Sequence, residues 1–242
     1  MILSIVMLSA IACTPAAAVT QLDPAIAVTE NGDDVIDIPG NGQLDPATTV
    51  DPNSPLTDAE IAGLLFMREE EKLAGDVYRA LNDQWGGNVF INIAESENMH
   101  TESVLALLDA YGIADPAKTE AGQFSNRDLQ ALYDQLTAQG SQSLQDAYLV
   151  GGAIEEIDIL DLETHIAETD RDDIIQVYEN LLRGSENHLR AFVRVFENQI
   201  RESYRPQYMT QERYSAIVQG ENGIGNGAGG QGFGRGNGAG RP

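Results

Sequence analysis

Residues 95–100 read "ESENMH" and lie inside a longer run, residues 89–111, whose apolar side chains recur with the period of an α-helix. When successive residues are placed about 100° apart, these apolar side chains share one face. Glu97 and His100 fall on that same face, each within about 30° of its midline, whereas Glu95 points elsewhere. The sequence therefore predicts a helix with a carboxylate and an imidazole on the face that should be buried.

A second helix is predicted over residues 58–81. "TDAE" at 57–60 has the pattern of a capping box, and the glycine pair that follows "NDQW" ends the periodicity. Within this helix, Glu70 falls within about 10° of the centre of the apolar face. Glu69 and Glu71 lie roughly a right angle or more away from it, so we expect them on a solvated face, paired with neighbouring basic residues.

Three further helices are predicted over residues 127–139, 144–167 and 170–203. Ser185 and His188 lie within the apolar stripe of the last one. Four long helices and one short helix, with no period-2 pattern to compete, predict an all-α bundle. The helix over 144–167 is apolar on all sides, so periodicity does not rank its four candidate acids, which are Glu155, Glu156, Asp158 and Asp161.

Inward carboxylates such as Glu70 and Glu97 need a partner, because an isolated buried charge costs several kcal/mol or more. No lysine or arginine is predicted to face inward, whereas two of the three histidines are. Carboxylates and imidazoles suit iron or manganese, and Glu-x-x-His on a helix directs both groups to one point. We therefore predict a buried metal site. His165 is interpreted as structural or surface, although Asp161 and His165 at i,i+4 give a weaker second candidate.

The motifs of these helices resemble an uncharacterised ferritin-like domain family of bacteria and archaea and are distantly similar to rubrerythrins. The resemblance covers about residues 56–197 and follows the family's order and spacing. It implies a left-handed, ferritin-like four-helix bundle with a short extra helix between the second and third long helices, and a carboxylate-bridged pair of metal ions. The motifs are "MREEEKLAGDVY", "NIAESENMH", "GGAIEEIDILDLE" and "GSENHLRAF".

The resemblance also implies a set of metal ligands. Glu70 would be the ligand from the first helix, Glu97 and His100 the pair from the second with Glu97 bridging, and His188 the second histidine. One position departs from the pattern, because Ser185 stands where the second Glu-x-x-His should have its glutamate.

Acids of the third long helix are candidates to replace that missing ligand. Glu155 and Asp158 match two acids that rubrerythrins carry three residues apart, and Glu156 is a rival for the role. Glu186 is one position beyond Ser185 and points about 100° away. If no acid compensates, a mononuclear or non-catalytic site is expected.

The composition restricts the partners. The formal net charge is -24, from 38 acidic residues against 14 Lys and Arg, so the backbone of a nucleic acid would be repelled and cations are the expected charged partners. Cys13 is the single cysteine, which excludes an intrachain disulfide, a thiolate zinc site and a CxxC redox pair.

The chain is predicted to be exported. Residues 1–18 read as a leader, and "AIAC" resembles a lipoprotein processing site at which Cys13 becomes a lipidated N-terminus in the periplasm or cell envelope; cleavage after residue 18 would instead release a secreted protein. Residues 19–55 are predicted to be an acidic disordered linker, 56–205 the bundle, and 206–242 a Gly-rich disordered tail.

These observations predict an exported di-iron protein, or one with iron and manganese, that oxidises Fe(II) with O2 or reduces peroxide. As a peroxidase it would need an external electron donor, since the chain has no rubredoxin-like cysteine pair. The alternatives are a metal-sequestering module without turnover and a purely structural bundle. Tyr78 and Tyr111, predicted inward, are candidates for hydrogen bonds to the ligands, with core packing as their other role. The oligomeric state is not predicted.

Overall fold

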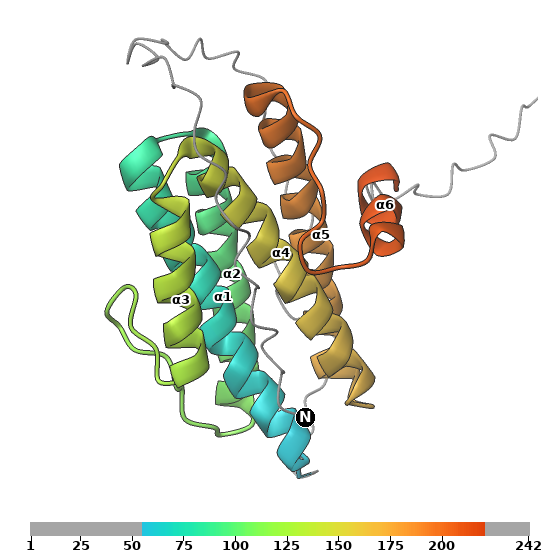
Figure 1. Cartoon of the computed structure of the whole chain (residues 1–242). Helices are drawn as coiled ribbons and strands as arrows, with labels where there is room; N and C mark the ends of the chain where they lie inside the picture. The colour runs from blue at the N-terminus through green and yellow to red at the C-terminus, as the bar shows by residue number, and fades with distance from the viewer. Residues whose placement is uncertain (1–54, 221–242) are drawn as a thin grey trace, which may run out of the picture. The chain divides into compact units, whose positions relative to one another are not determined.

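The computed structural model describes residues 55–220. The predicted leader, Cys13, the predicted linker up to residue 54, and residues 221–242 lie outside this range. The described chain forms six helices and no strand, which confirms the predicted all-α bundle (Figure 1). The helices are α1 (Asp58–Trp85), α2 (Asn88–Ala110), α3 (Arg127–Gly140), α4 (Leu144–Ala167), α5 (Asp172–Ile200) and α6 (Gln211–Gln219).

The helix starts follow the local sequence. Thr57 and Glu60 form the predicted capping box of α1, in which the Glu60 amide donates to Thr57 Oγ1 and the Thr57 amide donates to the Glu60 carboxylate. Asn126 accepts from two amides of the first turn of α3, and Ser143 accepts from the Asp146 amide in α4. The side-chain caps thus fix where three of the helices begin.

The four long helices form two pairs. α1 packs along α2, α4 packs along α5, and the pairs meet where α1 contacts α4 and α2 contacts α5 (Figure 1). Gly86 and Gly87 form the connection between α1 and α2, and both have positive φ, which residues without a Cβ adopt at little cost. The short α3 packs on α1 and α4. Therefore α1 has neighbours on several sides.

The interior consists of two apolar clusters with a polar layer between them. Along α1, α2 and α5, the residues of one cluster precede this layer and those of the other follow it; α4 has the same order except for Ile159, which follows the layer but packs in the first cluster. The first cluster includes Leu73, Tyr78, Phe90, Ile154 and Phe192, and the second includes Leu64, Met67, Leu107, Leu162 and Leu181. The polar layer holds Glu70, Glu71, Glu97, His100, Glu155, Asp158, Ser185 and His188, all of which are buried. Burial of the two apolar clusters stabilises the folded state and offsets the free-energy cost of burying the polar layer.

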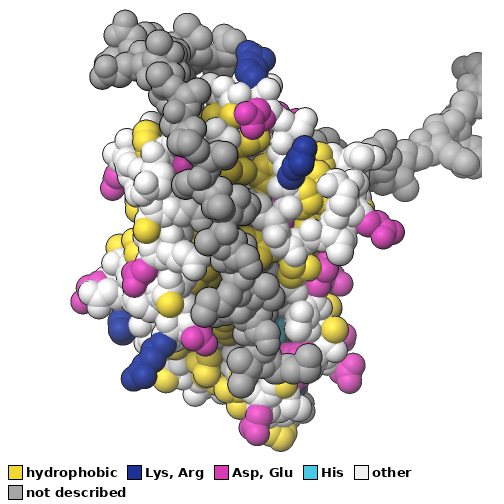
Figure 2. Space-filling view, in the orientation of Figure 1, with side chains coloured by type: hydrophobic (Ala, Val, Ile, Leu, Met, Phe, Trp, Pro, Cys, Tyr) yellow, Lys and Arg dark blue, Asp and Glu magenta, His cyan; other side chains and the backbone are white. Residues whose placement is uncertain are grey.

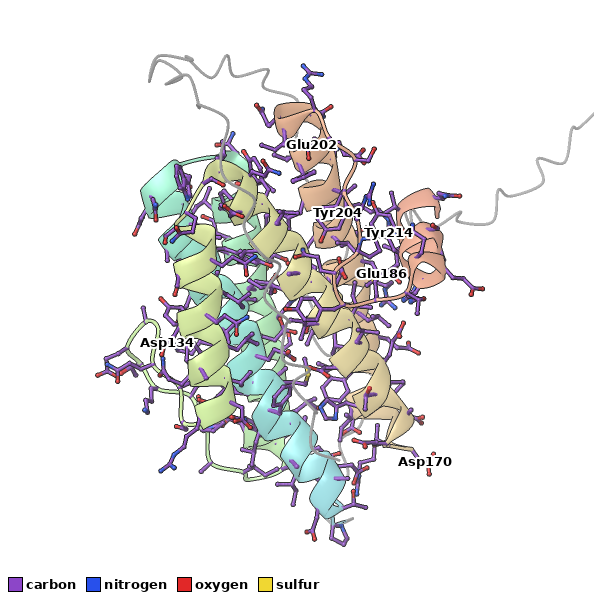
Figure 3. All side chains as sticks on the ribbon, viewed as in Figure 1. Asp134, Asp170, Glu186, Glu202, Tyr204 and Tyr214 are labelled. Atoms are coloured by element: carbon purple, nitrogen blue, oxygen red, sulfur yellow. The ribbon has the colours of Figure 1, made fainter. Side chains whose placement is uncertain are left out.

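The predicted start of the tail at residue 206 is wrong, because the described chain continues through residue 220 and ends in α6. Glu156 holds this segment, accepting from the Tyr204 hydroxyl and from the amides of residues 207, 208 and 209. Glu186 of α5 also contacts this segment, because it pairs with Arg213 of α6 at 2.7 Å; Figure 3 labels Glu186 and Tyr204 in this region. The sequence prediction did not include these long-range contacts.

Acidic side chains are spread over the face shown in Figure 2 rather than gathered in one patch. None of the helices between residues 55 and 220 is long and apolar enough to cross a bilayer. The buried polar layer, by contrast, gathers carboxylates and imidazoles in one place.

Candidate metal centre

Two clusters of metal-ligating side chains share one residue. The first comprises Glu71, Glu97 and His100, and the second comprises Glu97, Glu155 and His188. In each cluster the three ligand atoms lie within 4.8 Å of one another. All five residues are at most 2% exposed. Four helices thus bring two imidazoles and two further carboxylates together around Glu97.

The first cluster joins α1 and α2. His100 Nδ1 lies 2.8 Å from Glu97 Oε2 and 3.3 Å from Glu71 Oε2. α5 also approaches here, since a Cβ at Gly184 would lie 2.6 Å from His100 Nε2. A side chain at position 184 would displace the imidazole, so the absence of one lets His100 occupy this position.

The second cluster joins α2, α4 and α5. His188 Nδ1 lies 2.9 Å from Glu97 Oε1 and 3.5 Å from Glu155 Oε2. The other imidazole nitrogen, Nε2, is 3.0 Å from the hydroxyl of Ser96. Because each Glu97 oxygen faces a different histidine, this carboxylate lies between the two clusters and belongs to both.

Glu155 is held by a tyrosine. The Tyr78 hydroxyl donates to Glu155 Oε1 at 2.5 Å and also lies 3.3 Å from the Gly151 carbonyl. This leaves Glu155 Oε2 directed to His188. Tyr78 is fully buried, as predicted, whereas Tyr111 is only partly buried and donates to Asp173, away from both clusters.

The two histidines and Glu97 stabilise one another's charged forms. Burial raises the pKa of Glu97, but His188 and His100 outweigh it and hold that pKa below its usual range. Burial lowers the pKa of His188, but Glu97 and Glu155 raise it to about 9. The pKa of His100 is raised well above its usual value by Glu97 and Glu71, against the effect of burial. Without a metal, the layer therefore retains protons on its imidazoles.

The histidines offset the charge of the remaining carboxyl groups only in part. Burial, only partly offset by His100, raises the pKa of Glu71 to about 7. Burial also raises the pKa values of Glu155, Asp158 and Glu70, and neighbouring carboxylates raise the last two further. The layer has more carboxylates than imidazole cations can balance, which favours bound protons or metal ions.

Several polar atoms of the layer have no hydrogen-bond partner within the described chain. A buried donor or acceptor left unpaired costs about 1–3 kcal/mol, more for a charged group. His188 Nδ1 is one of them, although it lies 2.9 Å from Glu97 Oε1. The unpaired atoms are Glu70 Oε2, Glu71 Oε1, His100 Nε2, Asp158 Oδ1 and His188 Nδ1. All five are carboxylate oxygens or imidazole nitrogens, and three belong to residues of the two clusters, which is consistent with a cation site.

Ser185, which stands where a glutamate was expected, is buried and hydrogen-bonded. Its hydroxyl donates to Asp158 Oδ2 and lies 2.9 Å from the Leu181 carbonyl. Asp158 is 4% exposed, and its Oδ1 is unpaired. Asp158 of α4 is thus held by Ser185 inside the polar layer but belongs to neither cluster.

The prediction that Glu69 and Glu71 lie on a solvated face is wrong, because both are buried. The three consecutive glutamates of α1 face three different neighbours. Glu69 accepts from the amides of the loop before α3, Glu70 interacts with Asp158 and Asp161 of α4, and Glu71 faces His100 of α2. A helix packed on several sides buries residues that are about 100° apart. An apolar stripe in the sequence marks only one of these sides.

Some of the other predicted site residues belong to the two clusters and the rest lie outside them. Glu97, His100, Glu155 and His188 are brought together, whereas Glu70 lies beside the clusters without belonging to either. Glu156 faces the segment before α6, and Glu186 pairs with Arg213, so neither competes for the site. His165 contacts Glu168 at 3.3 Å and packs near Phe66, outside both clusters. Glu71 was missed; the only sequence signal for it was its place in an acidic triplet.

Comparison with known proteins places the chain among close relatives. The family model described as "Uncharacterized protein domain (DUF2202)" matches residues 60–221. The uncharacterized protein MJ0754 of Methanocaldococcus jannaschii is 48% identical over 168 residues, which is 69% of this chain and 90% of that protein. The crystal structure of the hypothetical protein MJ0754 from Methanococcus jannaschii superposes with a TM-score of 0.69 at 46% identity, over 72% of this chain and 99% of that one.

Proposed function

The chain belongs to the DUF2202 family, and we propose that its bundle is ferritin-like and binds two metal ions, iron or iron with manganese. The proposed activity is oxidation of Fe(II) with O2 or reduction of peroxide. The observation that carries this proposal is the pair of buried carboxylate–imidazole clusters that share Glu97. Carboxylate oxygen and imidazole nitrogen are suitable donors for these metals.

The side chains fit a pair of cations. Glu71 and His100 would hold one ion, Glu155 and His188 the other, and Glu97 would bridge them. Both histidines present Nδ1 to the carboxylates, so the same nitrogen would ligate in each half. Two divalent ions would offset the carboxylate charge that the layer otherwise balances with protons.

Neighbouring groups would orient the ligands. The Tyr78 hydroxyl fixes Glu155, and Ser96 holds Nε2 of His188 so that the Nδ1 lone pair faces Glu97 and Glu155. The apolar clusters on either side limit access of water to the layer. Bound iron would supply the electron-transfer steps with O2 or peroxide, while these residues set geometry and proton positions.

The source of electrons depends on the reaction. In Fe(II) oxidation the substrate iron supplies them. In peroxide reduction an external donor is required, because the single cysteine of the chain lies at position 13 and forms no CxxC pair. The proposed partners are therefore metal ions, O2 or peroxide, and a separate reductant in the second case.

Ser185 favours a second candidate function, a metal-sequestering module without turnover. The half of the site that contains His188 lacks the expected glutamate of α5, and Asp158 is a shorter carboxylate from another helix. If this half binds its ion weakly, the site would retain iron without cycling it. A purely structural bundle is the remaining alternative.

Metal analysis followed by rapid kinetics separates these functions. The full chain is loaded anaerobically with Fe(II), or with Fe(II) and Mn(II), and bound metal is measured after desalting. The loaded protein is then mixed with O2 or hydrogen peroxide in a stopped-flow absorbance experiment, with chelator-treated protein as the control. We expect two ions per chain and a fast absorbance change. Two bound ions without oxidation support sequestration, and a chain that retains no metal would contradict both proposals.

We also propose that the protein is exported and anchored in the cell envelope through lipidated Cys13, with simple secretion as the alternative. Labelled fatty acid should be incorporated into the wild-type chain and not into Cys13→Ser. Release of soluble wild-type protein into the medium would favour secretion instead.

A further inference from the structure

A pocket of about 240 Å³ lies beside the first cluster, between α1, α2 and the segment after α2. Arg68, Glu71 and Lys72 of α1 and Thr101 of α2 are among its lining residues, with Lys118 from the following segment. Because Glu71 also contacts His100, one wall of the pocket belongs to the candidate metal centre. The pocket thus extends from that centre toward the surface.

The charge of the pocket is opposite to that of the chain. Its lining includes four cationic residues, Arg68, Lys72, Arg79 and Lys118, against three acidic ones, Glu71, Asp76 and Asp115. The chain as a whole has 14 Lys and Arg against 38 acidic residues. Four of the 14 basic residues therefore gather around one small cavity, where they outnumber the acidic residues by one in a chain that is otherwise strongly acidic.

Arg68 has unused donors at this place. Its side chain is 10% exposed, and Nη2 donates to Asp115 Oδ2 at 2.8 Å. Its Nε and Nη1 are buried and have no hydrogen-bond partner within the described chain. A guanidinium carries five N–H donors and binds oxyanions through them, so a buried guanidinium with two unpaired nitrogens calls for an acceptor.

The neighbouring cations hold the pocket in shape. Lys72 donates to Asp76 at 2.5 Å and to the Glu120 carbonyl at 3.0 Å, and Arg79 donates to Asn98 at 2.6 Å. Lys118 is exposed at the rim. The pocket therefore combines positive groups held by hydrogen bonds with a buried guanidinium whose Nε and Nη1 are unpaired. The long, exposed side chain of Lys118 is able to reach over a ligand.

We propose that this pocket binds a small oxyanion, of the size of phosphate or a short carboxylate, with Arg68 as its principal donor. The bound anion would lie next to Glu71, on the α1–α2 side of the candidate metal centre. The inference rests on the pocket itself and does not require the proposed metal function.

Binding of inorganic phosphate to chelator-treated full chain tests the proposal. Titration is followed by calorimetry at low ionic strength, where charge attraction is least screened. We expect saturable binding of one phosphate per chain and at least about tenfold weaker binding in Arg68→Gln, the loss expected for a charge-assisted hydrogen bond. Arg183→Gln removes the same charge from an exposed position of α5 and should leave binding unchanged.

Lys118→Gln provides a second test that does not alter a buried residue, and it should weaken binding by a smaller factor. The proposal is overturned if no saturable binding occurs up to about 10 mM phosphate. It is also overturned if Arg183→Gln weakens binding as much as Arg68→Gln and Lys118→Gln, or if phosphate binds only after metal loading. Metal binding without phosphate binding would refute the anion pocket and leave the proposed metal function standing. Phosphate binding without metal binding would support the pocket and refute the metal function.

Discussion

The two halves of the candidate centre contain the same kinds of ligands but are built differently. In the α1–α2 half, Glu97 and His100 come from one Glu-x-x-His motif, and Glu71 faces them. In the α4–α5 half, His188 has no glutamate three residues before it, and its carboxylate neighbours are Glu97 and Glu155. An approximate repeat in sequence therefore becomes an asymmetric site in space.

The difference lies in where the carboxylates of each half come from. Ser185 supplies no carboxylate, and its hydroxyl donates to Asp158, which belongs to neither cluster. Tyr78 and Ser96 also support only this half, through Glu155 and His188. The α4–α5 half thus depends more on its surroundings, and we expect it to bind its ion more weakly.

The largest effect should come from Glu97, because both halves share it. Glu97→Gln removes the bridging charge and should reduce bound metal from two ions per chain to at most a weakly held one. Metal analysis after anaerobic Fe(II) loading measures this, and the circular dichroism spectrum checks that the bundle is retained. Glu95→Gln, at an exposed position of the same helix, is the matched control and should bind two ions. Full metal content in Glu97→Gln would show that the clusters are not the binding site.

Single histidine replacements should separate the halves. His100→Ala and His188→Ala each remove one imidazole and should each lower the stoichiometry to about one ion per chain. Because Glu97 remains in both variants, the other half should still bind. Titration with Mn(II) under electron paramagnetic resonance distinguishes one site from two. Loss of both ions in either variant would mean that the centre assembles only as a pair.

Metal binding should strengthen as the pH rises. The pKa of His188 is raised to about 9 and that of Glu71 to about 7, so both groups hold protons at pH 6 and must release them to ligate. Each proton released on binding increases the apparent affinity about tenfold per pH unit, until the pH exceeds the pKa of the group. Calorimetric titrations of the chelator-treated chain in two buffers at pH 6, 7 and 8 give the number of protons released. An affinity independent of pH over this range would contradict the proposed ligands.

A smaller effect is expected at Ser185. Ser185→Ala removes the hydrogen-bond donor that holds Asp158. The affinity of the α4–α5 half for its ion should fall by about tenfold, the lower end of the range for a residue that orients a ligand. The α1–α2 half should keep its affinity. Ser185→Glu tests the same comparison in the other direction, and restored affinity there would show that Asp158 is a replacement for the missing glutamate. Equal losses at both ions in Ser185→Ala would point to a general packing defect instead.

Much of the fold could be predicted because its signals are local. The signals that begin and end helices lie within a few residues, as in the capping box of Thr57 and Glu60 and the Asn126 cap. The helices predicted over 58–81, 89–111, 127–139 and 144–167 match α1 to α4 closely. The segment ending in α6 was not predicted. Its order depends on Glu156, about 50 residues earlier in the chain, which accepts from the backbone of residues 207 to 209.

The sequence by itself determined that Glu97, His100 and His188 lie on buried helix faces, since their spacing relative to apolar residues fixes their direction. Only the tertiary structure decided that Glu71, rather than Glu70, joins the first cluster, that Glu155 and not Glu156 faces His188, and that Ser185 donates to Asp158. The physical reason is that periodicity gives a side chain's angle about its own helix. Which neighbouring helix stands at that angle depends on how all the helices pack together.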